Sequence, residues 1–447
     1  MAEDALASPA LEETALTEEA VAVLPGIRLS PQQRLALQQL EDFVGGKEKL
    51  YLLTGYAGTG KTTLLQALLK RLKKRGDRIR IVFTAFSNKA TKVLASMAAQ
   101  WNLEIDCMTC CQLLGLRPEI DDKTGKQVFK PDRKSENLID RYHLVVVDEA
   151  SMINEEMWLL LTQAVSDLLK RTQILFVGDV AQLPPIGELE SQVFQQIYQR
   201  SDLTEVVRYG GAIAFLAESL RNNLEQEQLP AFETDTNGDR TEGVLRVPQR
   251  EWEKLLIRAF QSEAYLKDSD YVRVLAYTNQ RVHQLNHKIR TAIYGTGQPR
   301  FVEGERLVAN TPYRLEDEVI LQTSSECEVL DIHRGKDGPW ETWSLYVQTD
   351  DDHNRTLSVL HESSLTEFNR LLKLYADEKR WLEFWDLRNA FADVNYAYCL
   401  TVHKSQGSTF QNVFVDVPNA CVNRNHRERN QLLYVAVTRA AKRVFIF

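Results

Sequence analysis

The chain of 447 residues has few cysteines and no long hydrophobic run. Its longest uncharged apolar stretches, such as residues 144–147 and 174–178, are far shorter than the ~20 residues that span a bilayer. The first residues, Met1-Ala-Glu-Asp, lack the basic start and apolar run of a signal peptide. We therefore expect a cytoplasmic protein without membrane contact. In that reducing compartment, the six cysteines are expected to be free thiols.

The chain also lacks an excess of positive charge, since 54 basic and 62 acidic residues give a net charge of −8. This balance excludes a histone-like binder but not a nucleic-acid enzyme. Residues 1–24 carry six acids and no base, so the rest of the chain has a net charge of only −2, which leaves room for a local basic groove. We interpret residues 1–27 as a flexible acidic tail, either a solvated extension or a regulatory segment.

Most of the remaining chain alternates between strand and helix patterns. Short apolar runs predict strands at 51–54, 79–84, 143–147 and 174–177, and leucines at helical spacing predict a helix over 62–72. Continuous β-branched runs are typical of strands that are buried on both faces of a parallel sheet. The sequence therefore predicts an α/β fold with helices on both faces of a parallel sheet.

Two segments break this alternation. Residues 116–130 place Gly125 between two extended patterns, which predicts an inserted β-hairpin. Residues 306–394 carry short strand patterns separated by turns, followed by helical patterns near 365–376 and 380–391. We expect a small β-barrel with helical segments there.

Residues 55–62 read GYAGTGKT and lie between a predicted strand and a predicted helix. This is the phosphate-binding loop pattern, in which glycines let backbone N–H groups face a phosphate and the helix N-terminus adds a positive dipole end. Lys61 is expected to reach the β- and γ-phosphates of ATP, and the Thr62 hydroxyl to bind Mg²⁺. The alternative is a chance glycine-rich turn. The residues expected at the nucleotide are Gly55, Gly58, Thr59, Gly60, Lys61, Thr62 and Thr63.

Two other predicted strands end in polar residues. Residues 145–149 end in Asp148, which is expected to hold Mg²⁺, and Glu149, which is expected to deprotonate the attacking water. Residues 176–187 place Gln182 in a proline-rich turn, from which its amide could reach a γ-phosphate. Taken alone, these patterns also fit solvated acids and ordinary turns. Beside a phosphate loop, we favour the catalytic interpretation.

Together, residues 55–62, 145–151 and 176–187 resemble helicase motifs I, II and III. Residues 29–36, 84–90, 203–208, 400–409 and 433–440 resemble the Q-type motif and motifs Ia, IV, V and VI. Their order resembles the superfamily 1 helicases of the 5′→3′ RecD-like group, and the compact length resembles the Dda type most. The resemblance covers about residues 28–447. Motif Ib departs from the pattern because Thr109-Cys-Cys lacks the usual histidine, and motif Ia carries Phe86 and Ser87 where Pro and Thr are common.

The resemblance implies roles for further residues. Gln33 would contact the adenine, Gly407 would contribute to the nucleotide site, and Arg208 and Arg439 would stabilise the charge of phosphoryl transfer. The implied catalytic set is Lys61, Glu149, Gln182, Arg208 and Arg439. The implied DNA track consists of Phe86, Ser87, Asn88, Lys89, Thr109, Phe129, Thr401, His403 and Lys404.

The resemblance also implies a domain organisation and a function. We expect a RecA-like domain 1A at 28–202 with the hairpin (1B) at 109–135 inserted, a RecA-like domain 2A at 203–305 and 395–447, and an SH3-like barrel with helices (2B) at 306–394. The function expected is an ATP-dependent DNA helicase that translocates 5′→3′ on single-stranded DNA and unwinds duplex at junctions. We expect a monomer that meets single-strand-binding or replication proteins. The alternatives are a translocase that mainly strips bound proteins and an ATP-gated binding module without turnover.

Overall fold

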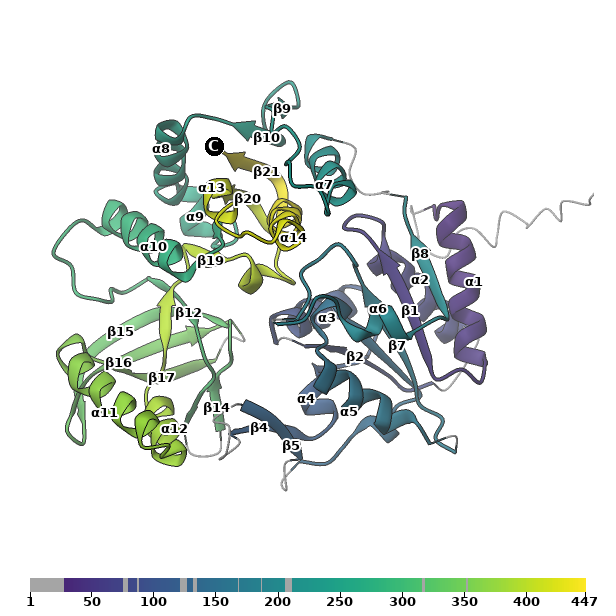
Figure 1. The fold of residues 1–447 in the computed structure, drawn as a ribbon, viewed down its shortest axis with the longest axis horizontal. Helices are drawn as coiled ribbons and strands as arrows, with labels where there is room; N and C mark the ends of the chain where they lie inside the picture. Colours follow the sequence, from purple (N-terminus) through teal and green to yellow (C-terminus); the bar gives the residue numbers. More distant parts are fainter. Residues whose placement is uncertain are drawn as a thin grey trace, which may run out of the picture.

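The structure is a computed structural model, and it describes residues 28–74, 79–86, 88–120, 127–131, 135–167, 169–185, 187–205, 211–315, 318–350 and 353–447. The predicted acidic tail at 1–27, the predicted DNA contact Ser87 and the predicted catalytic Arg208 lie outside the described residues. Figure 1 shows the arrangement of the rest: two lobes built on parallel sheets, and an antiparallel sheet beside the second lobe.

The first lobe is built on six strands that pair in parallel in the order β3-β2-β6-β7-β1-β8. The strands are β1 (Leu50–Gly55), β2 (Ile81–Ala85), β3 (Asp106–Thr109), β6 (Leu144–Asp148), β7 (Gln173–Gly178) and β8 (Arg200–Leu203). The helices are α1 (Pro31–Gly45), α2 (Lys61–Lys74), α3 (Asn88–Gln100), α4 (Cys110–Leu113), α5 (Glu155–Val165) and α6 (Gln192–Gln196), with short 3₁₀ turns η2 (Ile139–Arg141) and η3 (Ala150–Met152). The four predicted strands and the predicted helix are confirmed as β1, β2, β6, β7 and α2.

Burial explains why this lobe folds as its periodicity predicts. The apolar residues 144–147 of β6 have no exposed surface, because the strand has neighbours on both sides and helices on both faces. Helix α2 buries its leucines on one face and ends in basic residues, which the helix dipole favours at a C-terminus. Helix α1 begins with a capping box in which Ser30 and Gln33 exchange hydrogen bonds.

The second lobe contains a sheet with the order β19-β11-β20-β21-β10-β9, parallel except for the edge pair β10/β9. Its strands are β9 (Asp235–Thr236), β10 (Gly243–Arg246), β11 (Val272–Ala276), β19 (Cys399–Thr401), β20 (Phe410–Val415) and β21 (Ala440–Ile446). Its helices are α7 (Ala212–Asn222), α8 (Gln249–Phe260), α9 (Glu263–Lys267), α10 (Asn279–Tyr294), α13 (Val417–Ala420) and α14 (His426–Thr438), with the 3₁₀ turn η5 (His403–Ser405). Helices α7 and α14 lie on the side that faces the first lobe (Figure 1).

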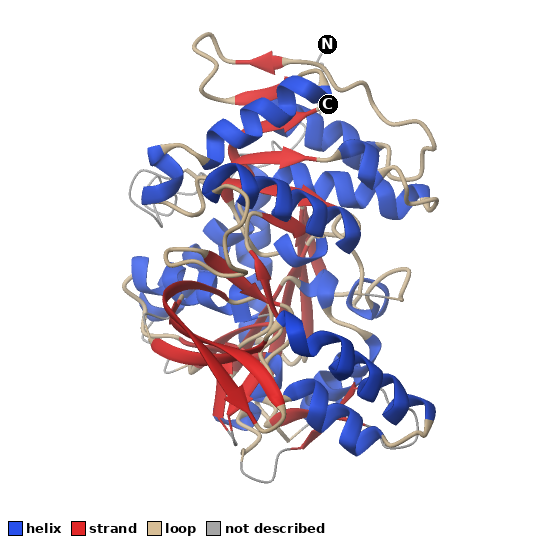
Figure 2. Ribbon diagram, turned by 90° about the vertical axis from the view of Figure 1, so that its left-hand side faces the viewer, coloured by secondary structure: helices blue, strands red, loops and turns tan. Residues whose placement is uncertain are grey.

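A curved antiparallel sheet interrupts the second lobe between α10 and β19 (Figure 2). Its order is β17-β16-β15-β12-β18, formed by β12 (Arg306–Ala309), β15 (Glu326–Asp337), β16 (Trp340–Thr349), β17 (Asn354–Leu360) and β18 (Val394–Tyr396). Strands β13 (Tyr313–Leu315) and β14 (Glu318–Leu321) pair beside it, and the turn η4 (Glu362–Ser364) leads into helices α11 (Leu365–Asp377) and α12 (Trp381–Asn389). The SH3-like barrel and the domain boundaries stay predictions.

The segment predicted as a hairpin contains the strands β4 (Leu116–Ile120) and β5 (Gln127–Pro131), which pair antiparallel with Leu116 opposite Pro131. Residues 121–126 between them lie outside the described residues. The backbone N–H of Phe129 donates a hydrogen bond of 3.1 Å to the Glu156 carboxylate of α5. The base of the pair therefore rests on its own lobe.

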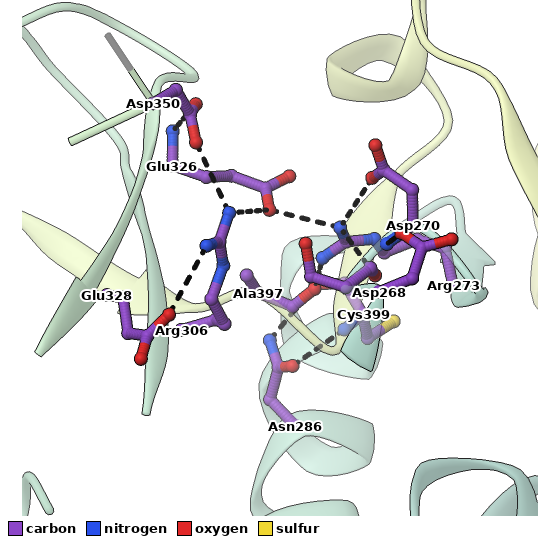
Figure 3. Close-up of polar contacts among 11 residues, drawn as sticks. Asp268, Asp270, Arg273, Asn286, Arg306, Glu326, Glu328, Asp350, Ala397 and Cys399 are labelled. Carbon is purple, nitrogen blue, oxygen red and sulfur yellow. Dashed lines mark hydrogen bonds and ion pairs between the residues drawn. The ribbon is translucent and has the colours of Figure 1, made fainter. Parts of the chain in front are cut away.

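Buried charges form the seam between the second lobe and the antiparallel sheet (Figure 3). The Arg273 side chain of β11 is fully buried, with Nη2 3.0 Å from Glu326 Oε2 of β15, and it also donates to the carbonyl of Ala397. Beside it, Arg306 of β12 pairs with Asp350 at 3.2 Å and with Glu326 at 3.8 Å. Because a buried charge is stable only when it is paired, removing one partner from this seam would leave the other charge uncompensated.

Candidate functional site

The loop between β1 and α2 has the conformation that phosphate binding requires. Gly58 and Gly60 have φ of 83° and 84°, a region that only glycine enters readily. A side chain at Gly60 would collide with the amide of Gln33. The buried Thr59 hydroxyl donates to the Tyr56 carbonyl at 2.9 Å and fixes the turn. The predicted phosphate loop therefore turns tightly into the N-terminus of α2, where backbone N–H groups favour an anion.

Lys61 lies within this loop. Its Nζ donates to the backbone carbonyls of Gly55 at 2.5 Å and Tyr56 at 3.1 Å. Thr62 and Thr63 follow in the first turn of α2 and are partly exposed. The loop thus combines an ammonium group, two hydroxyls and the dipole of a helix N-terminus, which together suit a polyphosphate.

Gln33 supports the phosphate loop from behind. Its Nε2 donates to the Thr59 carbonyl at 2.9 Å, and its Oε1 accepts the Ser30 backbone N–H at 3.0 Å. Both ends of the amide are engaged and the side chain is buried. This bracing role was not visible in the sequence, and the predicted adenine contact stays a prediction.

The two acids follow β6, whose carboxyl end lies at the same edge of the sheet as that of β1 because the strands are parallel. Burial, followed by the charge of Glu149, raises the pKa of Asp148 to about 7, although Lys61 acts to lower it. A partly buried carboxylate beside a second acid is a ligand that a divalent cation would stabilise, so Asp148 and Thr62 fit Mg²⁺ by their chemistry. Glu149 has φ of 52°, and strained conformations of this kind cluster at functional sites.

Several buried polar atoms around the cleft lack hydrogen-bond partners among the described residues. They are Ser151 Oγ after the two acids, Gln182 Oε1 in the turn after β7, and Gln406 Nε2 and Ser408 Oγ beside Gly407. Buried polar groups are nearly always paired, so these four side chains keep hydrogen-bonding capacity that the described residues do not use. The sequence analysis assigned a role to Gln182 but none to the other three, although each lies within a motif, at 145–151 or 400–409.

The second lobe reaches the phosphate loop through residues that the sequence did not assign. The guanidinium of Arg221 in α7 lies 3.7 Å from the centre of the Tyr56 ring. The predicted finger Arg439 is buried within its own lobe, where it donates to the carbonyls of Val435 at 3.3 Å and Ser408 at 3.2 Å. The structure therefore does not bring Arg439 into contact with the phosphate loop.

Gly407, predicted at the nucleotide, lies next to Ala90 of α3, where the two lobes meet. Its φ is 74°, and a Cβ there would lie 3.2 Å from the Cβ of Ala90. Only a residue without a side chain allows this close approach of motif V to motif Ia. This close approach is by itself a sufficient reason for a glycine at position 407. The predicted role of Gly407 at the nucleotide stays a prediction.

The residues predicted for the DNA track lie on both lobes. The Thr109 hydroxyl caps α4, and the Thr401 hydroxyl accepts the backbone N–H of Lys404. Lys404 Nζ donates to Asn310 Oδ1 of the inserted segment at 2.6 Å, and burial lowers the pKa of Lys404. Burial also lowers the pKa of His403.

A cavity of about 440 Å³ adjoins this track between the lobes, and its lining includes Pro184, Tyr277, His403 and Gln431. Phe86 is partly buried against the first-lobe core. Asn88 and Lys89 begin α3, directly after the undescribed Ser87.

Comparisons with known proteins agree with this arrangement. The AAA domain family matches residues 28–238, and the UvrD-like helicase C-terminal domain matches residues 396–447. The chain is 26% identical to protein R530 of Acanthamoeba polyphaga mimivirus, over 92% of this chain and 98% of that protein. It is also 26% identical to the ATP-dependent DNA helicase dda of Enterobacteria phage T4, over 89% of this chain and 95% of that protein.

More distant similarities are found to a RecD subunit and to a Pif1 structure. The RecD subunit of RecBCD from Buchnera aphidicola is 22% identical, over 89% of this chain and 70% of that protein. A structure of Pif1 helicases at forked duplex DNA superposes with a TM-score of 0.52 at 16% identity, covering 94% of this chain and 92% of that chain, which shows a shared fold. None of the helices among the described residues is long and apolar enough to cross a membrane.

The phosphate loop, the acids after β6 and the two parallel-sheet lobes define a P-loop nucleotide hydrolase with two lobes of the RecA-like kind. Within that class, the two family matches and the relatives identify an ATP-dependent DNA helicase that is similar to the superfamily 1 helicases RecD and Dda.

Proposed function

We propose that this ATP-dependent DNA helicase hydrolyses ATP between its two lobes and thereby translocates 5′→3′ along single-stranded DNA, unwinding duplex at junctions. The observation that best supports the proposal is the meeting of the phosphate loop with the helix of motif VI, where the backbone N–H of Ala57 donates to Tyr434 Oη at 3.0 Å. The phosphate loop thus contacts the second lobe directly, so a change in the loop when nucleotide binds would reach both lobes. The 5′→3′ direction rests on the family resemblance.

In this proposal, each residue of the first lobe has a chemical task. Lys61 and the backbone N–H groups of the loop bind the triphosphate, and Glu149 deprotonates the attacking water. Thr62 and Asp148 would hold Mg²⁺, which would neutralise phosphate charge when bound. The unpaired Oε1 of Gln182 would orient the water or the γ-phosphate.

Closure of the cleft would couple hydrolysis to movement. Arg439 and Arg208 would stabilise the developing charge on the γ-phosphoryl group, and Arg439 would first exchange its bonds to Val435 and Ser408 for the phosphate. If each lobe grips the strand in alternate halves of the cycle, closure and opening become net steps. Separating one base pair costs about 1.4 kcal/mol of stacking, which is well within the reach of one hydrolysis.

The DNA would cross both lobes. Phe86, Thr109, His403 and Lys404 are proposed to contact it, together with Thr401 and residues 87–89, chiefly at the phosphates, which position the strand. The paired strands β4 and β5, with Phe129, would split the duplex at the junction. Their support on α5 through Glu156 is consistent with a wedge that is fixed to one lobe.

The test is strand displacement on duplexes that carry either a 5′ or a 3′ single-stranded tail, with ATP hydrolysis followed in parallel. We expect unwinding of the 5′-tailed duplex only. Glu149→Gln should keep nucleotide binding while hydrolysis falls by about 10²–10⁴-fold, as expected for loss of a general base. Unwinding from the 3′ tail would overturn the direction. Release of streptavidin from a biotinylated strand without unwinding would instead identify a translocase that strips proteins.

A further inference from the structure

Helix α14 contacts the first lobe through two side chains on one face. Tyr434 Oη donates to Asp179 Oδ2 at 2.6 Å and accepts the backbone N–H of Ala57 at 3.0 Å. Gln431 Nε2 donates to the Gln182 carbonyl at 2.9 Å. Residues three apart on a helix lie on the same face, so Gln431 and Tyr434 together dock α14 on the phosphate loop and on the turn after β7.

The Tyr434 hydroxyl is the centre of this contact. Its side chain is only 1% exposed, and Asp179 is fully buried. The other oxygen of Asp179 accepts the Ala181 backbone N–H at 2.9 Å, so Tyr434 supplies the second donor to this carboxylate. A hydroxyl that donates to a buried carboxylate forms one of the stronger hydrogen bonds in proteins. The hydroxyl thus joins three motifs that are far apart in the sequence.

We propose that Tyr434 is a positioning residue for ATP hydrolysis, because its hydroxyl sets how the helix that leads into Arg439 lies against the phosphate loop. The inference rests on the proposed function. Arg439 directly follows the last residue of α14, so a shift of the helix displaces its guanidinium. A misplacement of about 1 Å can cost about 10²-fold in rate. Tyr434 itself touches neither Lys61 nor the proposed Mg²⁺ residues.

The experiment is Tyr434→Phe, measured as kcat and KM for ATP on saturating single-stranded DNA. Phenylalanine keeps the ring and removes both hydrogen bonds across the cleft. We expect kcat to fall by about 10–100-fold, with KM for ATP nearly unchanged, because nucleotide binding is left to the loop. The matched control is Tyr142→Phe, which removes a similar hydroxyl bond to Asp106 at 2.7 Å within the first lobe. Its kcat should equal that of the parent.

Two outcomes for Tyr434→Phe overturn the inference. A parent-like kcat in Tyr434→Phe would make the contact merely structural. A raised KM with an unchanged kcat would place Tyr434 at the nucleotide itself. If Tyr434→Phe unfolds at the assay temperature, Gln431→Met decides, since it removes the other contact of the same face: a lower kcat supports the inference and a parent-like kcat overturns it. Absence of DNA-stimulated hydrolysis in the parent chain would instead refute the proposed function.

Discussion

Two internal surfaces of this molecule differ in their chemistry. The seam between the second lobe and the antiparallel sheet is held by ion pairs around the fully buried Arg273. The cleft between the lobes is held by the hydrogen bonds of Tyr434 and Gln431 and by Arg221 over Tyr56. Separating a buried ion pair leaves uncompensated charge, at a cost of about 3–5 kcal/mol. Breaking the amide bond of Gln431 costs about 1 kcal/mol, and breaking the bond of the Tyr434 hydroxyl to a carboxylate costs about 1.5–3 kcal/mol. We therefore expect the seam to resist separation more than the cleft does.

The largest predicted effect is the loss of ATP turnover when Arg439 is replaced. Arg439→Lys keeps the charge but loses the planar fork, and turnover on saturating single-stranded DNA should fall by about 10³–10⁵-fold, as for other arginine fingers. The unfolding midpoint should change little. The matched control is Arg443→Lys, because Arg443 donates to Asn412 within the second lobe, away from the cleft. Turnover of Arg439→Lys within a few-fold of the parent would show that Arg439 is not a finger.

The next largest effect is expected on the free energy of unfolding when an ion pair of the seam is broken. Glu326→Ala leaves Arg273 buried without its 3.0 Å partner and should lower the free energy of unfolding by about 3–5 kcal/mol, measured by urea denaturation. Glu328→Gln is the control, because the Glu328 side chain is 41% exposed and lies 3.7 Å from Arg306. It should change the unfolding free energy by no more than about 1 kcal/mol. If both variants lower the free energy of unfolding equally, the buried ion pair of Arg273 contributes no more than an exposed one, and the proposed difference between seam and cleft is wrong.

Lys404 adjoins both surfaces, since it lies in the proposed DNA track and bonds to Asn310 of the inserted segment. If it binds a phosphate, Lys404→Ala should reduce the slope of log affinity against log salt for single-stranded DNA by about 0.7. Fluorescence anisotropy titrations at several salt concentrations would measure this slope. An unchanged slope with a lowered melting temperature would assign Lys404 to the seam alone.

The smallest effect is expected from Arg221. Its contact with Tyr56 is worth about 0.5–2 kcal/mol, so Arg221→Gln should reduce DNA-stimulated turnover by no more than about thirtyfold. Steady-state phosphate release would measure it. A loss as large as that expected for Arg439→Lys would identify Arg221, already across the cleft in this structure, as the arginine that meets the phosphates.

The sequence predicted the elements whose signal is local. The phosphate loop, β6 and β7 follow from glycine spacing and from apolar runs, and the strands of the 306–394 segment from turns between short apolar runs. The contacts between elements were not predictable in this way, because Tyr434 and Asp179 are 255 positions apart and nothing in either neighbourhood specifies the other. Gln33 shows the same limit: its motif was identified, but its partner Thr59 depends on how α1 packs on the loop.

The inserted segment leaves and rejoins the second lobe at one place, because β12 and β18 are paired neighbours, with Leu307 opposite Tyr396. A segment whose ends already touch adds little strain to its host, and the entropic cost of closing it grows only slowly with its length. The antiparallel sheet and its helices could therefore be replaced as one unit by another inserted segment during evolution, without repacking the lobe that carries them. A replacement would have to return a carboxylate to the place of Glu326, which lies 3.0 Å from the fully buried Arg273.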